Sequence, residues 1–154
     1  MADIRRIDIT QPPGPRMSRC VVRGDTVYLC GLTAGDTSQD IKGQTTQILE
    51  RIDHYLREAG TSKSNLLTAN LWIKDMALFR DMNSLWNEWV DPQNPPARAC
   101  VRADLARPEV LVEIMVTAAK QQICHSEGRR SHLDRAIPIG RSLRRNEIAS
   151  LRSQ

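Results

Sequence analysis

The fold is decided by the stretch from Asn94 to Glu113, which reads NPPARACVRADLARPEVLVE. Its two prolines, Pro95 and Pro96, favour an extended backbone at the start of the stretch. Proline fixes φ and biases the residue before it away from the α region. The run 97–103 that follows places Arg98, Cys100 and Arg102 at every second position. On a strand these three side chains share one face, so the run predicts a strand with a polar, chemically active face.

A second apolar run, 110–119, carries one carboxylate, Glu113. A lone carboxylate in such a run is costly unless it has a partner. A hairpin that turns at Arg107–Pro108 would return Glu113 beside the first strand. We therefore expect this hairpin to gather one guanidinium, one thiol and one carboxylate, from Arg98, Cys100 and Glu113.

Length and composition indicate a single small domain. The chain has 154 residues, which is enough for one modest core. No apolar run approaches membrane-spanning length, and the first residues show no signal-peptide pattern. The four cysteines (20, 30, 100 and 124) have no C-x-x-C spacing. We expect reduced cysteines, a cytoplasmic location and no association with a membrane.

The net charge of +4 belongs to the end of the chain. Residues 121–154 hold seven Arg against three acidic side chains, whereas 1–120 hold fifteen of each sign. We predict a domain over 1–120 and a basic, disordered extension over 121–154. The neutral body gives no reason to expect a nucleic-acid surface. Two alternatives for the extension are a basic nucleic-acid arm and a metal site at Cys124, His125 and His132, which lacks a fourth ligand at a usual spacing.

Periodicity predicts the remaining elements. Strands are expected over 4–10, 16–22, 26–30 and 65–74, and helices over 36–59 and 76–90. Asp36 or Ser38 would cap the first helix, Gly60 would end it, and Asp75 would cap the second. The aromatic stripe of the second helix is interpreted as core packing.

Two helices can cover only one face of a mixed sheet, which gives a two-layer α+β domain. The last strand is apolar on both faces, since Val112 and Ile114 alternate with Leu111 and Met115. The second face must meet something else. Another copy of the chain is the simplest covering, so we predict a homo-oligomer.

Several motifs resemble those of the reactive intermediate deaminase family, the RidA/YjgF-like enamine/imine deaminases. The resemblance spans roughly residues 15–120, and P-A-R-A-C-V followed by a glutamate is its most specific part. The motifs are G-D-T-V-Y-L-C-G (24–31), the helix with Gln44, Gln47 and Ile52, W-I-K-D (72–75) with Phe79 and Asn83, P-A-R-A-C-V (96–101) and V-E-I-M-V-T-A (112–118).

The resemblance implies a chorismate-mutase-like (bacillus-type) α+β fold, packed as a homotrimer with sites in clefts between subunits. It also implies hydrolysis of 2-imino and enamino acids to 2-oxo acids and ammonia. Arg98 would clamp the substrate carboxylate, and Glu113 would handle the attacking water or relay its proton. No metal or cofactor is expected, because an imine is already activated toward water.

The same resemblance suggests further residues of the substrate site. Cys100 is expected as a wall of the site rather than a nucleophile, since no partner histidine is evident. Gly31 would let backbone approach a ligand, although a plain strand-end glycine is an equal interpretation. Asn83 matches a family position, but a surface residue of its helix is the simpler interpretation.

One departure concerns the N-terminal region. Many family members carry an aromatic residue after a Gly-Pro, where this chain has Arg16 and Met17. Met17 can fill an apolar wall of the substrate site. The departure leaves a non-catalytic carboxylate binder or chaperone-like regulator as an alternative. A ribonuclease is a third hypothesis, but the neutral body lacks the clustered cations that phosphate contacts need.

Overall fold

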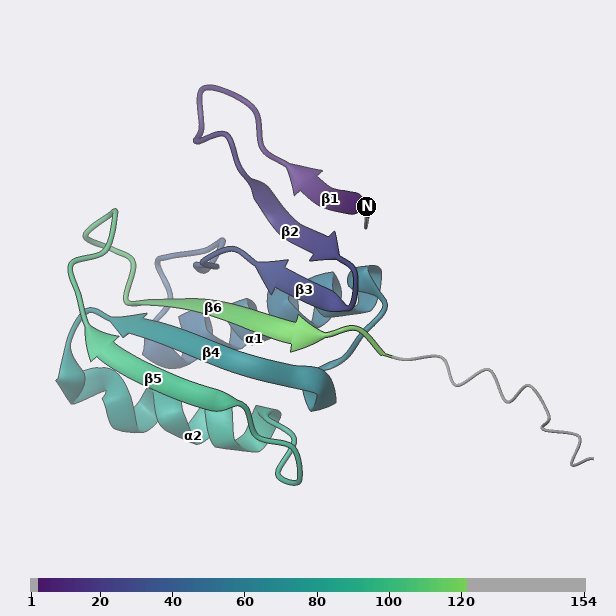
Figure 1. Ribbon diagram of the computed structural model, residues 1–154. Coiled ribbons are helices and arrows are strands. Elements are labelled where there is room, and N and C mark those ends of the chain that lie inside the picture. The colour runs from purple at the N-terminus through teal and green to yellow at the C-terminus, as the bar shows by residue number, and fades with distance from the viewer. Residues whose placement is uncertain (1–2, 122–154) are drawn as a thin grey trace, which may run out of the picture. The chain divides into compact units, whose positions relative to one another are not determined.

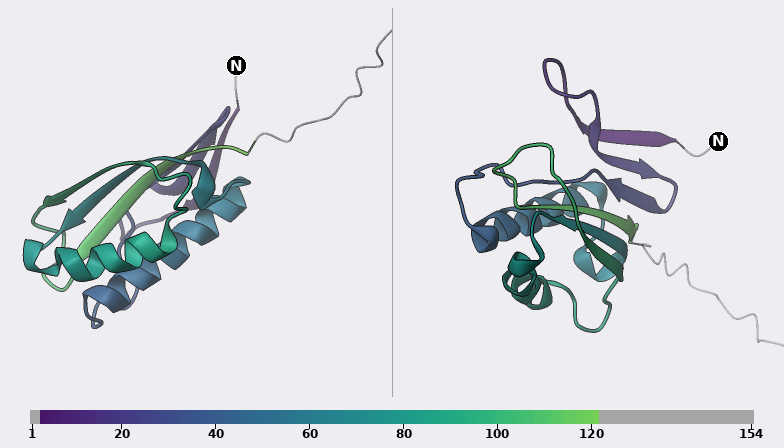
Figure 2. Two further views of the ribbon diagram at one scale, coloured as in Figure 1. Left: turned by 90° about the horizontal axis from the view of Figure 1, so that it is seen from below. Right: turned by 90° about the vertical axis from the view of Figure 1, so that its left-hand side faces the viewer.

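The computed structural model describes residues 3–121, which form one mixed sheet with two helices packed on one of its faces (Figures 1 and 2). This confirms the predicted two-layer α+β architecture. The elements are β1 (Ile4–Ile9), β2 (Ser18–Arg23), β3 (Thr26–Leu29), α1 (Ile41–Ala59), β4 (Leu66–Ile73), α2 (Phe79–Trp89), β5 (Ala97–Arg102) and β6 (Val112–Ala119), with short 3-10 turns at Lys63–Asn65 and Met76–Leu78. The predicted extension over 121–154 lies, apart from its first residue, outside the described residues and stays a prediction.

The strand order is β1-β2-β3-β6-β4-β5, and only the β4–β5 pair is parallel. The predicted hairpin between the last two strands is therefore wrong, because β4 lies between them (Figure 1). The helix that joins β4 to β5 explains this arrangement. Parallel neighbours need a crossover connection, and α2 supplies it, so β5 pairs with one side of β4 and β6 with the other.

The ends of α1 show which local signals were informative. The Asp40 carboxylate accepts a hydrogen bond from the Gly43 N–H at 2.9 Å, so the helix begins later than predicted. Asp36, an expected cap, instead accepts from the N–H and hydroxyl of Ser38 in the loop before the helix. The predicted C-terminal end is confirmed, because Gly60 adopts a φ of 83° that a glycine accommodates without strain.

The core lies between the sheet and the helices. On β6 the residues that point toward the helices, Val112, Ile114, Val116 and Ala118, are at most 1% exposed. The alternate residues from Glu113 to Ala119 are only half-buried within one chain. One predicted buried face is thus confirmed, while the other is the face that no helix covers (Figure 2).

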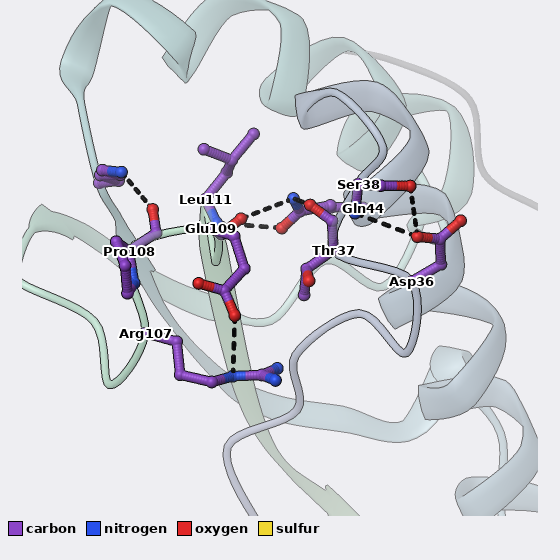
Figure 3. Close-up of polar contacts among 9 residues, drawn as sticks. Asp36, Thr37, Ser38, Gln44, Arg107, Pro108, Glu109 and Leu111 are labelled. Carbon is purple, nitrogen blue, oxygen red and sulfur yellow. Dashed lines mark hydrogen bonds and ion pairs between the residues drawn. The ribbon is translucent and has the colours of Figure 1, made fainter.

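A buried glutamine ties α1 to the loops at its N-terminal end (Figure 3). Gln44 is fully buried, and its amide nitrogen lies 3.0 Å from the carbonyl oxygens of Thr37, Gln39 and Glu109. Its side-chain oxygen accepts from the Leu111 N–H at 3.0 Å. Gln44 therefore fixes the loop that leads into β6. None of the described helices is long and apolar enough to cross a membrane.

Candidate active site

The two residues expected to perform the chemistry lie on opposite faces of the sheet. Arg98 is in register with Ala69 of β4, a buried residue on the helix-covered face. Glu113 is in register with Trp72, three positions further along β4. Directly opposed residues share a face and successive residues alternate, so Arg98 and Glu113 point to different sides. A single chain does not bring them together.

Arg98 lies on the edge strand β5 against α2. One guanidinium nitrogen donates to the Asn83 side-chain oxygen at 2.7 Å. The guanidinium carbon lies 4.9 Å from the centroid of the Trp86 ring and 5.9 Å from that of Phe79. Stacking on aromatic faces and a charge-assisted hydrogen bond fix the plane of the fork. The remaining N–H groups are available to an anion, because Arg98 forms no ion pair with any described carboxylate.

An open pocket of about 380 Å³ lies beside this guanidinium. Its lining is one cation among apolar and weakly polar walls: Met76, Phe79, Asn83, Arg98 and Cys100. The volume falls within the roughly 300–1,000 Å³ of small-molecule pockets. The pocket suits a small molecule with a carboxylate at one end.

Cys100 lines this pocket. Burial raises the pKa of the Cys100 thiol, and the neighbouring Arg98 guanidinium lowers it in part. His54, the histidine within the described residues, lies on α1 beside Glu58 and is not part of the pocket. Within the described residues no histidine therefore lies beside the thiol, and the role of Cys100 as a wall of the site stays a prediction.

Glu113 lies against Gly31, two residues past the end of β3. A β-carbon added to Gly31 would stand 1.9 Å from the Oε1 atom of Glu113. The carboxylate thus occupies space that only a glycine leaves open. The backbone bonds between Leu32 and Ile114, at 2.9 and 3.0 Å, hold this segment beside β6. The resemblance paired these two residues with one site, and the structure places them in contact.

A second, smaller pocket of about 190 Å³ lies beside Glu113. Trp72 and the loop after β5, from Ala103 to Ala106, form its other walls. Cys30 lies nearby; burial raises the pKa of its thiol, while a hydrogen bond and the positive charge of Arg19 lower it in part. The lining of this pocket contains two carboxylates, Glu113 and Asp104, and no described guanidinium.

Met17 lines neither pocket. Its N–H donates to the Thr10 hydroxyl at 3.1 Å, and its carbonyl accepts from the Thr10 N–H at 2.9 Å, which closes the loop between β1 and β2. Its expected role as a substrate wall stays a prediction. Within residues 3–121, no group of three or more His, Cys, Asp or Glu side chains is arranged to hold a metal ion.

The sequence analysis missed the aromatic setting of Arg98. The predicted core packing is confirmed, because Trp86 is buried in the core and Phe79 packs against it, but both rings also face the guanidinium. Asn83, left open as a surface residue, accepts its hydrogen bond. The sequence pattern could have predicted this contact. Phe79, Asn83 and Trp86 share one stripe of α2, and the next strand after this helix is the one that carries Arg98.

Comparisons with known proteins agree with this architecture. The pattern of the family described as Endoribonuclease L-PSP matches residues 10–120. A RutC family protein of Haemophilus ducreyi is 41% identical over 116 residues, covering 75% of this chain and 96% of that protein. The 3-aminoacrylate deaminase RutC of Acinetobacter baylyi is 30% identical over 115 residues, covering 71% of this chain and 90% of that protein.

Solved structures show the same fold. The crystal structure of NMB1025 from Neisseria meningitidis, described as a member of the YjgF protein family, superposes with a TM-score of 0.72 at 38% identity. The match covers 78% of this chain and 97% of that one. A putative translation initiation inhibitor from Salmonella typhimurium matches with a TM-score of 0.66 at 34% identity, covering 75% and 96%.

Proposed function

Because the chain belongs to the Endoribonuclease L-PSP (YjgF/RidA) family, we propose that it hydrolyses reactive enamine and imine carboxylates to oxo acids and ammonia. The observation that carries the proposal is Arg98: a guanidinium fixed by Asn83 and Trp86 at an open pocket, with no described carboxylate paired to it. Such a fork suits the carboxylate that these substrates share.

The reaction needs positioning and proton transfer. An enamino acid tautomerises to the imine, whose C=N carbon is electrophilic. Water adds to that carbon and loses one proton while the nitrogen gains one, which gives a carbinolamine. The remaining hydroxyl proton then moves to the nitrogen, and the C–N bond breaks to leave C=O and ammonia. Arg98 holds the carboxylate and so fixes the carbon relative to the water. Glu113 takes the proton from the water and returns it to the departing nitrogen.

These roles require two copies of the chain. Within one chain Arg98 and Glu113 lie on opposite faces, with β4 between their strands. Arg98 is on the edge strand, while Glu113 is on the face that no helix covers. We propose that Arg98 of one copy meets Glu113 of another in the homotrimer that the family resemblance implies. Burying the half-exposed face of β6 would stabilise that assembly.

The relative in Acinetobacter baylyi widens the proposed substrate class. It is named for 3-aminoacrylate, which is an enamine with a carboxylate on the same short carbon chain. The same clamp and the same water chemistry serve that compound and the 2-imino acids. We therefore propose small unsaturated amino carboxylates as the class, and include both types in the test.

The test is ammonia release from 2-iminobutanoate generated in place by a threonine dehydratase, with 3-aminoacrylate as a second substrate. Arg98→Ala should abolish most of the rate. Arg102→Ala is the matched control, since Arg102 lies on the same strand and face but is exposed and lines neither pocket. Equal oligomer size must be checked by light scattering. Full activity in Arg98→Ala would contradict the clamp.

The same assay separates the alternatives. Carboxylate binding at Arg98 without ammonia release would favour the non-catalytic binder. RNA cleavage is worth one control, because the family description names an endoribonuclease. The balanced charge of residues 1–120 gives no support to phosphate binding by the body. Cleavage by a protein truncated after 121 would nevertheless favour the ribonuclease.

A further inference from the structure

A groove between α1 and α2 has no place in the proposed reaction. Its apolar surface comes from Leu49, Leu85 and Trp89, and it encloses about 220 Å³. It shares no lining residue with the pockets beside Arg98 and Glu113. We refer to it as the α1–α2 groove.

The rim of the α1–α2 groove is acidic. Glu50 and Asp53 contribute from α1, and Glu88 contributes from α2. None of the three forms an ion pair with a described residue, and no described Lys or Arg lines the groove. Three carboxylates around an apolar floor leave a negative potential that a cation would complement.

Trp89 gives the groove a defined aromatic wall. Its indole N–H donates to the Asp53 carboxylate at 2.9 Å, which fixes the ring and the carboxylate relative to each other. The ammonium of Lys63 lies 5.4 Å from the ring centroid, so this indole already attracts a cation. Lys63 does not line the groove, but its positive charge offsets part of the potential there.

We propose that the α1–α2 groove binds a small organic ammonium ion with an apolar body. The apolar body would lie on Leu49 and Leu85, and the ammonium would lie among the carboxylates and the Trp89 ring. The volume is below the roughly 300–1,000 Å³ of drug-sized pockets, which favours a compact amine over a large ligand. The acidic rim repels a carboxylate, so the ligand differs in class from the substrates proposed for Arg98.

The site remains accessible under the proposed assembly. The copies are proposed to meet where the Arg98 pocket of one faces Glu113 of another, and the α1–α2 groove shares no lining residue with either of those pockets. The groove lies in the helix layer, away from the face of the sheet that carries Glu113 (Figure 2). Binding of an amine is therefore compatible with a working oligomer.

The experiment is a titration of the full chain with phenethylammonium chloride, followed by ¹⁵N–¹H spectra of the tryptophan indole groups. The Trp89 signal, assigned with Trp89→Phe, should move in a saturable way, because its N–H bonds to Asp53. The neutral alcohol 2-phenylethanol has the same body without the charge and should bind more weakly.

Variants test the charges in both directions. Glu50→Gln combined with Glu88→Gln should lower the affinity for the amine about fourfold. Two exposed charge pairs are lost, and each contributes a factor of about two to the affinity. Lys63→Gln should raise the affinity for the amine, because a cation that competes for the Trp89 ring is removed. Glu58→Gln is the control, since Glu58 lies on α1 outside the groove and beside His54.

Three outcomes would overturn the proposal: equal binding of the alcohol, no shift at Trp89, or unchanged affinity in the Glu50/Glu88 double variant. A shift caused only by a basic Lys/Leu peptide would assign the groove to a protein partner instead. None of these readouts depends on deaminase activity, so the groove and the proposed reaction can fail separately.

Discussion

Arg98 and Glu113 lie on opposite faces of one sheet, on strands that both pair with β4. The guanidinium is held against α2, while the carboxylate lies over Gly31 on the uncovered face. Each residue has its own pocket. This separation makes the proposed chemistry a property of the assembly, and several measurable consequences depend on it.

Asn83 should affect substrate binding indirectly, by holding the Arg98 guanidinium in position. Asn83→Leu removes the 2.7 Å hydrogen bond and leaves the guanidinium free to turn on Trp86. We expect KM to rise about tenfold, in keeping with about 1.5–3 kcal/mol for a hydrogen bond to a charged group. Steady-state kinetics measure this. Ser84→Ala, the next residue on α2 and an exposed one, is the control and should leave KM unchanged.

Gly31→Ala should displace the Glu113 carboxylate. The added methyl group would stand 1.9 Å from Oε1, and the flexible glutamate will move before the backbone does. We expect kcat to fall at least about tenfold, because general acid–base catalysis contributes roughly 10²–10⁴-fold. Gly35→Ala is the control, since its added carbon meets only Gln47 at an ordinary 3.8 Å. An unchanged kcat in Gly31→Ala would argue against Glu113 as the proton carrier.

Gln44→Leu should destabilise the fold. Leucine fits the buried position but leaves the Leu111 N–H and three carbonyls without their partner. The expected loss in free energy of unfolding is about 2–4 kcal/mol, since an unsatisfied buried group costs about 1–3 kcal/mol. Urea denaturation measures it. Gln39→Leu, at an exposed position, should cost far less.

Cys100 should alkylate slowly at neutral pH. Burial raises its pKa, so less thiolate is present at a given pH than for a free cysteine, and the rate should rise above the ordinary thiol range. Arg98 lowers the pKa in part, so Arg98→Ala should move the midpoint of the pH–rate profile upward. Mass spectrometry of the Cys100 peptide after iodoacetamide gives the profile. A midpoint below that of a free thiol would contradict this account.

The raised pKa of the thiol and the lack of a histidine in the pocket predict that Cys100 is not a nucleophile. Cys100→Ser keeps a small polar wall beside Arg98 and should retain most of the deaminase rate. Complete loss of the rate with an intact fold would show that the thiol takes part in the reaction.

Local sequence patterns predicted much of the fold. Period-two alternation divided the last strand into the two faces that β6 shows in the structure, and the strands predicted over 16–22 and 26–30 pair as β2 and β3. Gly60 marked the end of α1 because a left-handed residue there favours glycine. These features depend on neighbours in the chain, which the sequence displays directly.

Long-range pairing was not visible in the same way. The run from Ala97 to Ala119 favours a hairpin locally, and only the crossover through α2 places β4 between the two strands. The Arg98–Trp86 contact and the fit of Glu113 over Gly31 also join residues far apart in the chain. The sequence singled out Arg98 and Glu113 as candidates, but their separation onto two faces follows from this topology.

The most direct test of the central claim mixes two inactive variants. Arg98→Ala and Glu113→Gln should each lose ammonia release from 2-iminobutanoate. When the two are unfolded, mixed in equal amounts and refolded together, random assembly should restore about one quarter of the wild-type rate, because each site takes its arginine and its glutamate from different copies. Recovery near that level would support a site shared between chains. No recovery, with mixed oligomers demonstrated by mass spectrometry, would contradict it.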